Sequence, residues 1–592
     1  MITIYIYYMG VPAFFRKLIK KYKIVKNKLD IPIKSLYIDA NCLFHPQCFK
    51  ILDKYIDTTN QEILFKKMSD RIIEYIDYLI KKTNPETLVY IAVDGVAPRA
   101  KINQQRMRRF GYTNNYRHEI MKKYGIKFND SWSNIMITPG TQFMYDLHNK
   151  IQEYYTNYIK NNKDPTIKYD IIYDSYMTAG EGEHKILQHI KTTDPDYNKA
   201  TIIYGLDADL IFLSMSSQYP NIYLLREVIH YNSRGDDDNS ASNSIEEELC
   251  FADIDCVKRS INNDFSEKIY EFKDMKKCDN IDFTNDYIFI CYFLGNDFLP
   301  HLPSIDINID GLEMLINAYI DVYQLLGHNL IIINDNHVSI DNEFLIEFIS
   351  LVSSFEIEYF KRRLPDYLHR HKHKKCFEAE KYKQEIWEIE NLKNIHIKDP
   401  IKLGVGNEAD WKYRYYSHYF NTDEYMQETI NSLAHNYLEG LLWVTRYYFE
   451  KCPTWSWQYK HTHAPFLSDI LMYMDNKEIM IDFNTPYEEP IDIYSQLVSV
   501  VPSLYSHILP EALQYLSSSS TSPIIDMFPL TYKIDTIYKT QLYKCIPYIP
   551  YLDMKRVQSI VNKTILSEND TKKIQKIKPI YISKCKKTKK NN

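Results

Sequence analysis

The chain has 592 residues, of which 45% are hydrophobic and 25% are charged, so it is long enough for two or more domains with ordinary hydrophobic cores. Its net charge of −5 excludes a globally basic nucleic-acid coat, and any polyanion must be held by local basic patches. The sequence contains no run of 18 or more apolar residues, and its ten cysteines form no CxxC pair. We therefore expect no membrane span and predict a reducing compartment, the cytoplasm or the nucleus.

Two apolar, β-prone runs, residues 35–39 and 88–93, are predicted to be buried strands that lead into carboxylates. Asp39 ends the first run and Asp94 follows the second. Residues 61–82 between them have the amphipathic pattern of a crossover helix that joins parallel strands. Because the carboxyl ends of neighbouring parallel strands share one edge, where ligands bind, we predict an α/β fold with both aspartates at that edge.

The segment after Asp94 predicts an anion pocket. Pro98 breaks the chain, and a basic helical segment follows. Four of its polar side chains share one helical face: Lys101, Gln105, Arg108 and Arg109. Arginine supplies a rigid fork of donors and lysine a mobile charge, so this face suits a phosphate. A solvated basic helix is an equally open alternative for this stretch by itself.

Further carboxylates follow in three short motifs. In AGEGEHK (residues 179–185), Glu181 and Glu183 stand at a predicted helix start, where a charged N-cap is the alternative interpretation. A strand predicted over residues 201–209 ends with Asp207 and Asp209, whose spacing puts both on one side of an extended chain. Asp297 lies in GNDFLPHLP (residues 295–303). Clustered anions are costly to bury unless divalent cations lie between them, and so many oxygen ligands favour Mg²⁺ or Mn²⁺.

Several of these motifs closely resemble the Xrn family of 5′→3′ exoribonucleases. The resemblance begins with MGVPAFFRKL (residues 9–18), includes GNDFLPHLP, and continues through the second half of the chain, as in HNYLEGLLW (residues 435–443) and CPTWSWQY (residues 452–459). It implies a PIN-like nuclease sheet flanked by helices, with a smaller mixed α/β second domain. The implied activity is processive hydrolysis of single-stranded RNA with a 5′-monophosphate to 5′-mononucleotides, in RNA decay.

The resemblance also implies roles for individual residues. Two Mg²⁺ or Mn²⁺ ions would be held by seven carboxylates: Asp39, Asp94, Glu181, Glu183, Asp207, Asp209 and Asp297. The basic helical face would bind the 5′-phosphate. His45 would stack on the first base with Asn41 beside it, although a satisfied, half-buried histidine is the simpler interpretation of His45 taken alone. Trp455 and Trp457 would lie near the RNA path.

The predicted organisation is a nuclease domain over residues 1–364, a charged linker over 365–408, a second domain over 409–566 that braces the active site, and a basic, disordered tail over 567–592. The acidic stretch 233–249 is predicted to be a loop. A flap-type nuclease is the nearest alternative, but residues 298–311 after Asp297 lack the glycine spacing of its helix–hairpin–helix. A non-catalytic RNA-binding scaffold is the other. We expect a monomer.

Overall fold

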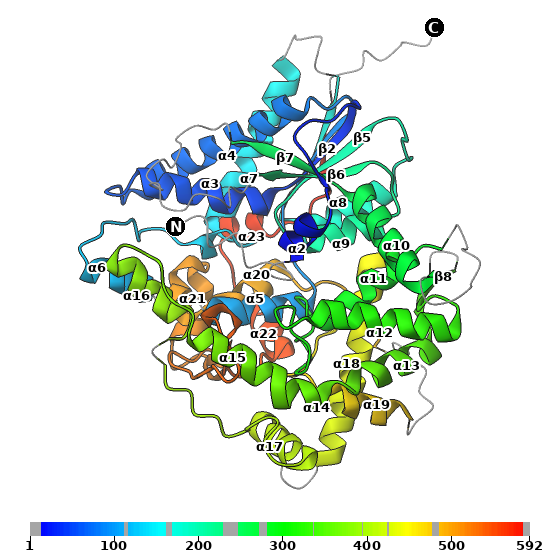
Figure 1. Ribbon diagram of the computed structural model, residues 1–592. Helices are drawn as coiled ribbons and strands as arrows, with labels where there is room; N and C mark the ends of the chain where they lie inside the picture. Colours follow the sequence, from blue (N-terminus) through cyan, green and yellow to red (C-terminus); the bar gives the residue numbers. More distant parts are fainter. Residues whose placement is uncertain are drawn as a thin grey trace.

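The computed structural model describes residues 14–111, 116–161, 168–228, 247–270, 281–334, 337–393, 395–422, 426–475 and 485–583 (Figure 1). Residues 1–13, which contain the first half of the MGVPAFFRKL motif, lie outside the described residues, as does most of the predicted acidic loop. Within the described part of the chain, no helix is both long and apolar enough to cross a bilayer.

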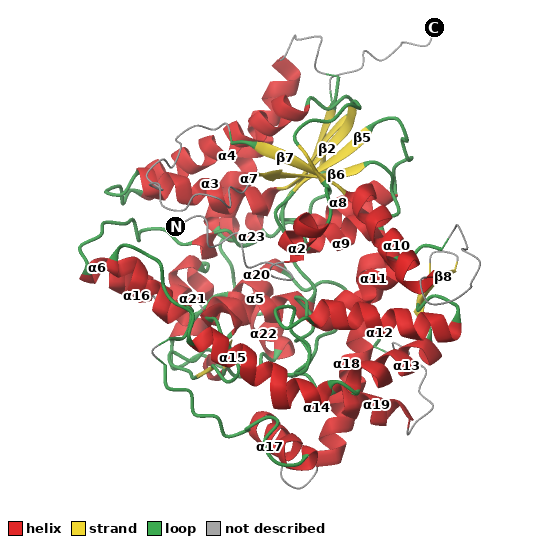
Figure 2. Ribbon diagram, viewed as in Figure 1, coloured by secondary structure: helices red, strands yellow, loops and turns green. Residues whose placement is uncertain are grey.

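An eight-stranded sheet forms the upper part of the molecule in Figure 2. Its spatial order is β1-β7-β6-β5-β2-β3-β4-β12, with parallel pairing from β6 through β4 and antiparallel pairing at both edges. The strands are β1 (Val25–Lys26), β2 (Ile33–Asp39), β3 (Leu88–Ala92), β4 (Asp170–Asp174), β5 (Ala200–Tyr204), β6 (Ile222–Glu227), β7 (Leu249–Asp253) and β12 (Ile580–Ile582). The predicted parallel α/β sheet is confirmed.

Both faces of this sheet are buried, because successive side chains of a strand point to opposite faces. Leu36 and Ile38 of β2 pack on one side with α3 (Ala40–Lys54), α4 (Gln61–Thr83) and α7 (Gln142–Asn161). Tyr37 packs on the other side. The helices there are α2 (Phe14–Lys21), α8 (Gly182–Lys191), α9 (Asp209–Ser216), α10 (Ile254–Tyr270), α11 (Thr284–Cys291), α12 (Gly311–Leu326) and α13 (Asn342–Ser353). The crossover helix predicted over residues 61–82 is thus α4, whose N-terminus is capped by Asn60.

The lower part of the molecule is mainly helical (Figure 2). It contains α5 (Arg99–Gly111), α6 (Tyr116–Lys123), α14 (Glu356–Glu358), α15 (Leu364–Lys372), α16 (Lys381–Glu390), α17 (Glu408–Phe420), α18 (Met426–Phe449), α19 (Leu467–Asp475), α20 (Ile493–Val500), α21 (Glu511–Ser518), α22 (Met554–Val561) and α23 (Glu568–Lys573). Two short hairpins complete it: β8 (Ile331–Asn334) with β9 (His337–Ile340), and β10 (Ile534–Asp535) with β11 (Ile546–Pro547).

The described short 3₁₀ and π turns are η2 (Asn134–Met136), η3 (Tyr292–Leu294), η4 (Tyr359–Arg363), η5 (Ser503–Ile508), η6 (Ile525–Met527) and η7 (Leu542–Lys544).

The two predicted domains share their cores. One buried cluster runs from Phe14 on α2 to Trp443 on α18, and another joins Ile102 of α5 to Leu497 of α20. The predicted charged linker contains α15 and α16, so much of it is helical, while most of its side chains are exposed or half-buried and α16 buries none. Helices α17–α19 belong to the same buried cluster as α2 and α9, so the second half shares a core with the first.

The predicted disordered tail also needs correction. Residues 568–573 form α23, and β12 pairs antiparallel with β4, so that Ile582 lies opposite Ile171. Ile582 is buried against the α3–α4–α7 side of the sheet. Burial of these isoleucines and the edge hydrogen bonds of β4 stabilise a segment whose lysine content alone indicates disorder. Only residues 584–592 of the tail lie outside the described part of the chain.

Candidate active site

Seven carboxylates meet beyond the carboxyl ends of the central strands. Asp39 is the last residue of β2, Asp94 follows β3, and Asp207 follows β5. The other four are Glu181 and Glu183 at the start of α8, Asp209 at the start of α9, and Asp297 in the loop after η3. Asp39 repels Asp94 and Asp207, and Asp209 repels Asp207 and Asp297, so the seven act on one another as a single acidic cluster.

Asp94 is held by backbone and side-chain groups from two other elements. The Gly182 N–H donates to Asp94 Oδ1 at 2.6 Å, and the Asp94 N–H donates to Asn41 Oδ1 at 3.1 Å. A Cβ on residue 182 would stand 2.9 Å from Asp39 Oδ1, so only glycine permits this approach. The family resemblance implies that Asn41 lies beside the substrate. In the structure Asn41 also fixes the loop that follows β3 and carries Asp94.

Lys185 and Asp174 are positioning residues that the sequence analysis missed. Asp174 ends β4, and its carboxylate lies 3.2 Å from Lys185 Nζ. The same ammonium group donates to the carbonyl oxygens of Val93 at 2.7 Å and of Ser175 at 2.8 Å. It thereby ties together the loops that follow β3 and β4, and so orients Asp94. The signal was present in the sequence, since Asp174 is another carboxylate at the end of an apolar run.

Lys101 lies inside the acidic cluster rather than in the phosphate pocket predicted for it. Its ammonium group forms ion pairs with Glu181 and, at 2.7 Å, with Asp297. Burial alone would lower the pKa of Lys101, but Asp297, Glu181 and the neighbouring carboxylates raise it well above its ordinary value. Lys101 is thus a fixed cation within the cluster.

A tyrosine from the second half of the chain completes the cluster. The Tyr447 hydroxyl on α18 donates to Glu181 Oε1 at 2.8 Å. The Tyr447 ring stacks on Trp443, with ring centroids 4.8 Å apart, and lies against His184 of α8. No local pattern in the sequence predicts this contact, because it depends on how α18 packs against α8.

Burial is the main cause of the raised pKa values of five of these carboxylates: Asp39, Glu181, Glu183, Asp207 and Asp209. Burial, followed by repulsion from Asp94, raises the pKa of Asp39 to about 8. Burial and repulsion from Asp207 raise the pKa values of Glu183 and Asp209 well above their ordinary range. Asp39 Oδ1 and Asp209 Oδ1 are buried without a hydrogen-bond partner among the described residues. Buried acceptors of this kind call for a cation.

The carboxylate oxygens of the acidic cluster suit a hard divalent ion. They do not yet lie close enough together to coordinate one. Among the described residues, no three His, Cys, Asp or Glu side chains stand close enough together for that. The Lys101 ammonium, between Glu181 and Asp297, is the nearest positive charge to the cluster. Carboxylate oxygens are the preferred ligands of Mg²⁺ and Mn²⁺, and small carboxylate movements would suffice to bring them round an ion.

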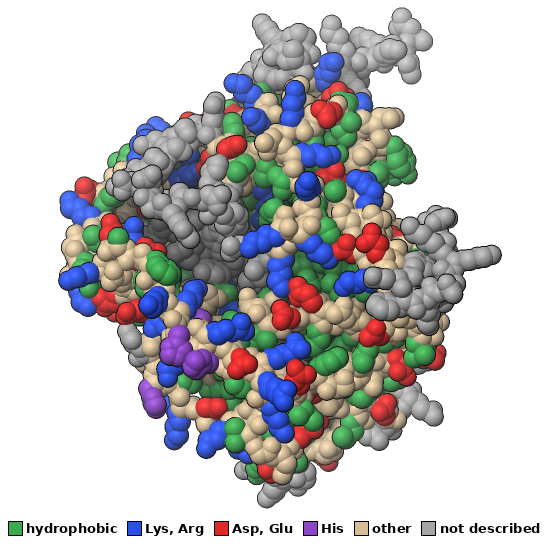
Figure 3. All heavy atoms as spheres, viewed as in Figure 1, with side chains coloured by type: hydrophobic (Ala, Val, Ile, Leu, Met, Phe, Trp, Pro, Cys, Tyr) green, Lys and Arg blue, Asp and Glu red, His purple; other side chains and the backbone are tan. Residues whose placement is uncertain are grey.

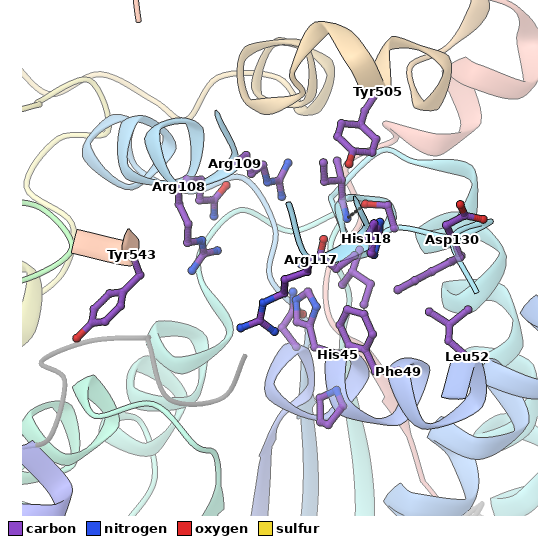
Figure 4. Close-up of a pocket in the computed structure, with 18 of the residues that line it drawn as sticks. His45, Phe49, Leu52, Arg108, Arg109, Arg117, His118, Asp130, Tyr505 and Tyr543 are labelled. Atoms are coloured by element: carbon purple, nitrogen blue, oxygen red, sulfur yellow. Dashed lines mark hydrogen bonds between the residues drawn. The ribbon is translucent and has the colours of Figure 1, made fainter. Parts of the chain in front are cut away.

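A cavity of about 620 Å³ opens beside the acidic cluster. Asp94 and Asp207 line it together with Asn41, His45, Gln105, Arg108 and Arg109. Figure 4 shows His45 reaching into the cavity from α3, opposite Arg108 and Arg109 on α5. On the face of the molecule in Figure 3, acidic and basic side chains are interspersed, so this interior concentration of arginines is a local feature.

Polar groups of this cavity are left without partners. Arg109 donates to Thr138 Oγ1 at 2.8 Å, but its Nη1 is buried with no partner among the described residues, as is Gln105 Oε1. Burial lowers the pKa of Arg109 to about 9, with a further contribution from Arg108. Burial, with Arg108 and Arg109, lowers the pKa of His45 to about 3, so its imidazole is neutral. An unpartnered guanidinium nitrogen beside a neutral, flat ring is an arrangement that suits an anion.

Helix α6 forms the far wall of the cavity with Arg117 and His118 (Figure 4). Arg117 forms an ion pair with Glu390 of α16, and the Tyr116 hydroxyl donates to the same carboxylate at 3.0 Å. Residues of the second half, among them Gln496, Tyr505 and Tyr543, also line the cavity. These contributions come from distant parts of the chain, and the sequence analysis did not find them.

The expected position of Trp455 and Trp457 near the RNA path stays a prediction, and the structure shows the surroundings of both residues. Trp457 is only 3% exposed, stacks on Trp443 and donates from Nε1 to Glu439 at 2.9 Å. Trp455 is half-buried, and its carbonyl accepts from the Arg99 N–H at the start of α5. Neither tryptophan lines the cavity. Trp457 thus packs in the core against α18, and the Trp455 backbone is held at the start of α5.

The sheet with acidic strand ends is of the type found in PIN-like nuclease domains. Residues 9–228 match the family described as the XRN 5′-3′ exonuclease N-terminus, and residues 277–391 and 366–591 match the Xrn1 helical domain. The two segments that match the Xrn1 helical domain together span residues 277–591, more than half of the chain. The protein therefore belongs to the Xrn family, as the resemblance of its motifs implied.

Named relatives agree with this assignment. The 5′-3′ exoribonuclease 1 of Schizosaccharomyces pombe is 28% identical over 677 residues, covering 95% of this chain and 49% of that protein. The human 5′-3′ exoribonuclease 1 is 30% identical over 599 residues, covering 93% and 34%. The 5′-3′ exoribonuclease 2 of Arabidopsis thaliana is 27% identical over 692 residues, covering 93% and 66%. The chain thus spans from a third to two thirds of the length of these relatives.

Proposed function

We propose that this protein is a 5′→3′ exoribonuclease that hydrolyses single-stranded RNA with a 5′-monophosphate, processively, to 5′-mononucleotides. One observation carries the proposal: a single cavity joins Asp94 and Asp207 of the acidic cluster to Gln105, Arg108 and Arg109 of α5. A 5′-phosphate bound by the arginines would place the first phosphodiester beside the carboxylates. The names of the relatives support the same activity.

Two Mg²⁺ or Mn²⁺ ions are part of the proposal. The residues that would hold them are the seven carboxylates of the acidic cluster, of which Asp39 and Asp209 each carry a buried, unpartnered oxygen. When bound, such ions supply an activated water and stabilise the leaving oxygen of a phosphodiester. Lys101 offsets part of the negative charge between Glu181 and Asp297, and Gly182 and Asn41 keep Asp94 oriented.

Selectivity for a 5′-monophosphate would come from the arginine pocket. Arg109 Nη1 has no other partner among the described residues, and Arg108 lies beside it. A pocket closed by α5 and α6 would have room for one phosphate and would exclude a triphosphate or a cap by sterics. The neutral ring of His45 would stack on the first base without reading its identity, so the RNA could advance after each cut.

The rival functions fit the structure less well. A flap-type nuclease binds duplex backbone through an exposed glycine-rich turn after its last aspartate. Here the segment after Asp297 is packed into the core, with Leu299, Leu302 and Ile305 buried. A non-catalytic scaffold would have no need to bury five mutually repelling carboxylates (Asp39, Glu181, Glu183, Asp207 and Asp209) at a free-energy cost.

A single assay tests the proposal against both rivals. The protein is incubated with Mg²⁺ and single-stranded RNA labelled at the 5′ end, or with a 5′ flap on a duplex, and the products are separated by size. An exoribonuclease releases labelled mononucleotide from the first substrate before shorter RNAs appear. A flap-type nuclease releases an oligonucleotide from the second, and a scaffold leaves both intact. Oligomeric state and compartment stay predictions: a monomer, in the cytoplasm or the nucleus.

A further inference from the structure

A second cavity, of about 350 Å³, lies behind the loop that carries Asp297. Its walls are the 295–308 loop on one side and residues 537–546 on the other. Asn296 and Asp297 line it directly, so it reaches the acidic cluster, because Asp297 forms an ion pair with Lys101. Its volume falls in the range of small-ligand sites, which begins at roughly 300 Å³.

The second cavity contains a cation that forms no direct ion pair. Lys539 lines it, and its ammonium group makes no hydrogen bond or salt bridge with any residue that the structure describes, although Asp535 and Asp306 lie near enough to attract it. Lys544, on the same wall, is paired with Asp306 at 3.4 Å. His301 adds a ring nitrogen beside the loop. An ammonium group that is attracted by carboxylates but not directly paired with one can still bind an anionic ligand, and phosphate oxygens are suitable partners.

The rest of the second cavity is aromatic. Tyrosines from five separate segments line it: Tyr359, Tyr367, Tyr415, Tyr419, Tyr538 and Tyr543. Tyr419 is held flat against His463, with ring centroids 3.6 Å apart. Flat aromatic walls bind a nucleobase by stacking with little dependence on its identity. Lys539 and the tyrosines together suit a ligand that has one phosphate and one base.

The two cavities lie on either side of one segment. Residues 541–543 line the first cavity, whereas residues 543 and 544 line the second, so that Tyr543 belongs to both. Figure 4 shows Tyr543 at the edge of the first cavity, on the far side of Arg108 from α6. If the first cavity holds the incoming RNA, as the proposed function has it, a second cavity offers the released nucleotide a separate way out.

We propose that the second cavity receives the 5′-mononucleotide released at the acidic cluster, with Lys539 facing its phosphate and the tyrosines facing its base. This inference rests on the proposed function and adds a separate product site to it. The product would pass Asp297 and the 541–544 segment, and the RNA would then advance into the space left behind. Binding in this cavity depends on the phosphate and tolerates any of the four bases.

The test is photolabelling of the whole protein, in EDTA, with 8-azidoadenosine 5′-monophosphate, followed by peptide mapping. We expect labelled tyrosines in peptides that contain residues 359–367 or 415–419, or Tyr538; label on Tyr543 alone does not count, because Tyr543 lines both cavities. Excess AMP should suppress the labelling, whereas adenosine should not. Lys539→Met should weaken labelling by about tenfold or more, the effect of losing one charge-assisted contact. The matched control, Lys533→Met, removes an exposed lysine from the same segment and should label like wild type.

Label confined to peptides around His45 and Phe49, or suppression by adenosine and AMP alike, would overturn the inference even if the protein degrades RNA. Equal labelling of the Lys539→Met and wild-type proteins would overturn it as well. The comparison of AMP with adenosine on wild type keeps the test valid if Lys539→Met does not fold. Failure to hydrolyse any RNA would instead refute the proposed function, and this inference with it.

Discussion

The hydroxyl of Tyr447 donates a hydrogen bond to Glu181 across 266 positions of the chain. Tyr447 lies on α18, which the sequence assigned to a supporting second domain, and Glu181 caps α8 beside the central sheet. The second half therefore reaches the acidic cluster directly, with a donor aimed at one carboxylate oxygen.

Tyr447→Phe should lower the rate of hydrolysis by about tenfold while leaving RNA affinity almost unchanged. A hydrogen bond to a charged group contributes roughly 1.5–3 kcal/mol, and its loss frees Glu181 to turn away from the cluster. Single-turnover hydrolysis and filter binding measure the two quantities. Tyr459→Phe removes a buried hydroxyl that donates to the His463 carbonyl instead, and it is the matched control. Equal effects of both variants would assign Tyr447 to packing alone.

Removal of the metal should stop hydrolysis. In EDTA, or in Asp207→Ala with Mg²⁺ present, product formation should fall below detection while RNA binding persists, because the arginines of the cavity are untouched. Asp526→Asn, an exposed acid paired with Arg556, should behave like wild type. Undiminished hydrolysis in EDTA would contradict the proposed use of two ions.

Stability of the metal-free protein should depend on pH through Asp39. The ordinary pKa of an aspartate is 3.8, and that of folded Asp39 is about 8. Folding therefore favours the protonated carboxyl, so its contribution to stability is full below about pH 4 and is lost as the pH rises through 8. Urea unfolding in EDTA should show a falling midpoint over this window. Asp39→Asn should flatten the dependence, and an identical slope in both proteins would show that Asp39 is not buried as described.

Arg108→Ala should remove the preference for 5′-monophosphate RNA over 5′-hydroxyl RNA. Loss of one charge-assisted phosphate contact corresponds to about ten- to a hundredfold in rate or affinity. The measurement is the ratio of degradation rates for the two RNAs. Arg363→Ala, an exposed arginine paired with Glu358, should leave that ratio unchanged. A wild-type protein that degrades both RNAs equally fast would exclude a phosphate pocket on α5.

A fragment that ends at Arg363 should be insoluble or inactive. It would expose the apolar surfaces of Ile102 and Phe110 that α20–α22 cover. It would also leave the buried Arg106 guanidinium without the Ser499 carbonyl to which it donates at 2.9 Å. Expression, size-exclusion chromatography and the RNA assay test this expectation. A soluble fragment with full activity would refute the supporting role of the second half.

Much of the acidic cluster was predictable from the sequence, because apolar strands followed directly by carboxylates locate an edge of a parallel sheet. The sequence did not predict which way the Lys101 side chain points. Lys101 shares a helical face with Arg108, yet it lies two turns nearer the strand ends, where Glu181 and Asp297 attract it. Helical periodicity predicts on which face of a helix a residue lies. It does not predict which side chains from other elements pack against each turn of that face.

The burial of Trp457 and the folding of the tail were not predictable for a related reason. The pattern around Trp457 does not say that Gly440 of α18 lets its ring approach, although a Cβ there would stand 2.8 Å from that ring. Likewise, Ile580–Ile582 is too short and too close to lysines to be recognised as a strand. Its pairing with β4 is a long-range contact, and long-range contacts override local propensity.

Strand β12 has a consequence for how the protein is made. It pairs with β4, more than 400 positions earlier in the chain, and covers an edge that would otherwise expose unpaired N–H and C=O groups. A ribosome adds roughly 5–20 residues per second, so the edge of β4 stays open for tens of seconds after it emerges. During that time the growing chain carries a sheet that another nascent chain could extend. The sheet is complete only when residue 582 has left the ribosome. The rate of translation therefore limits how soon the sheet can be assembled.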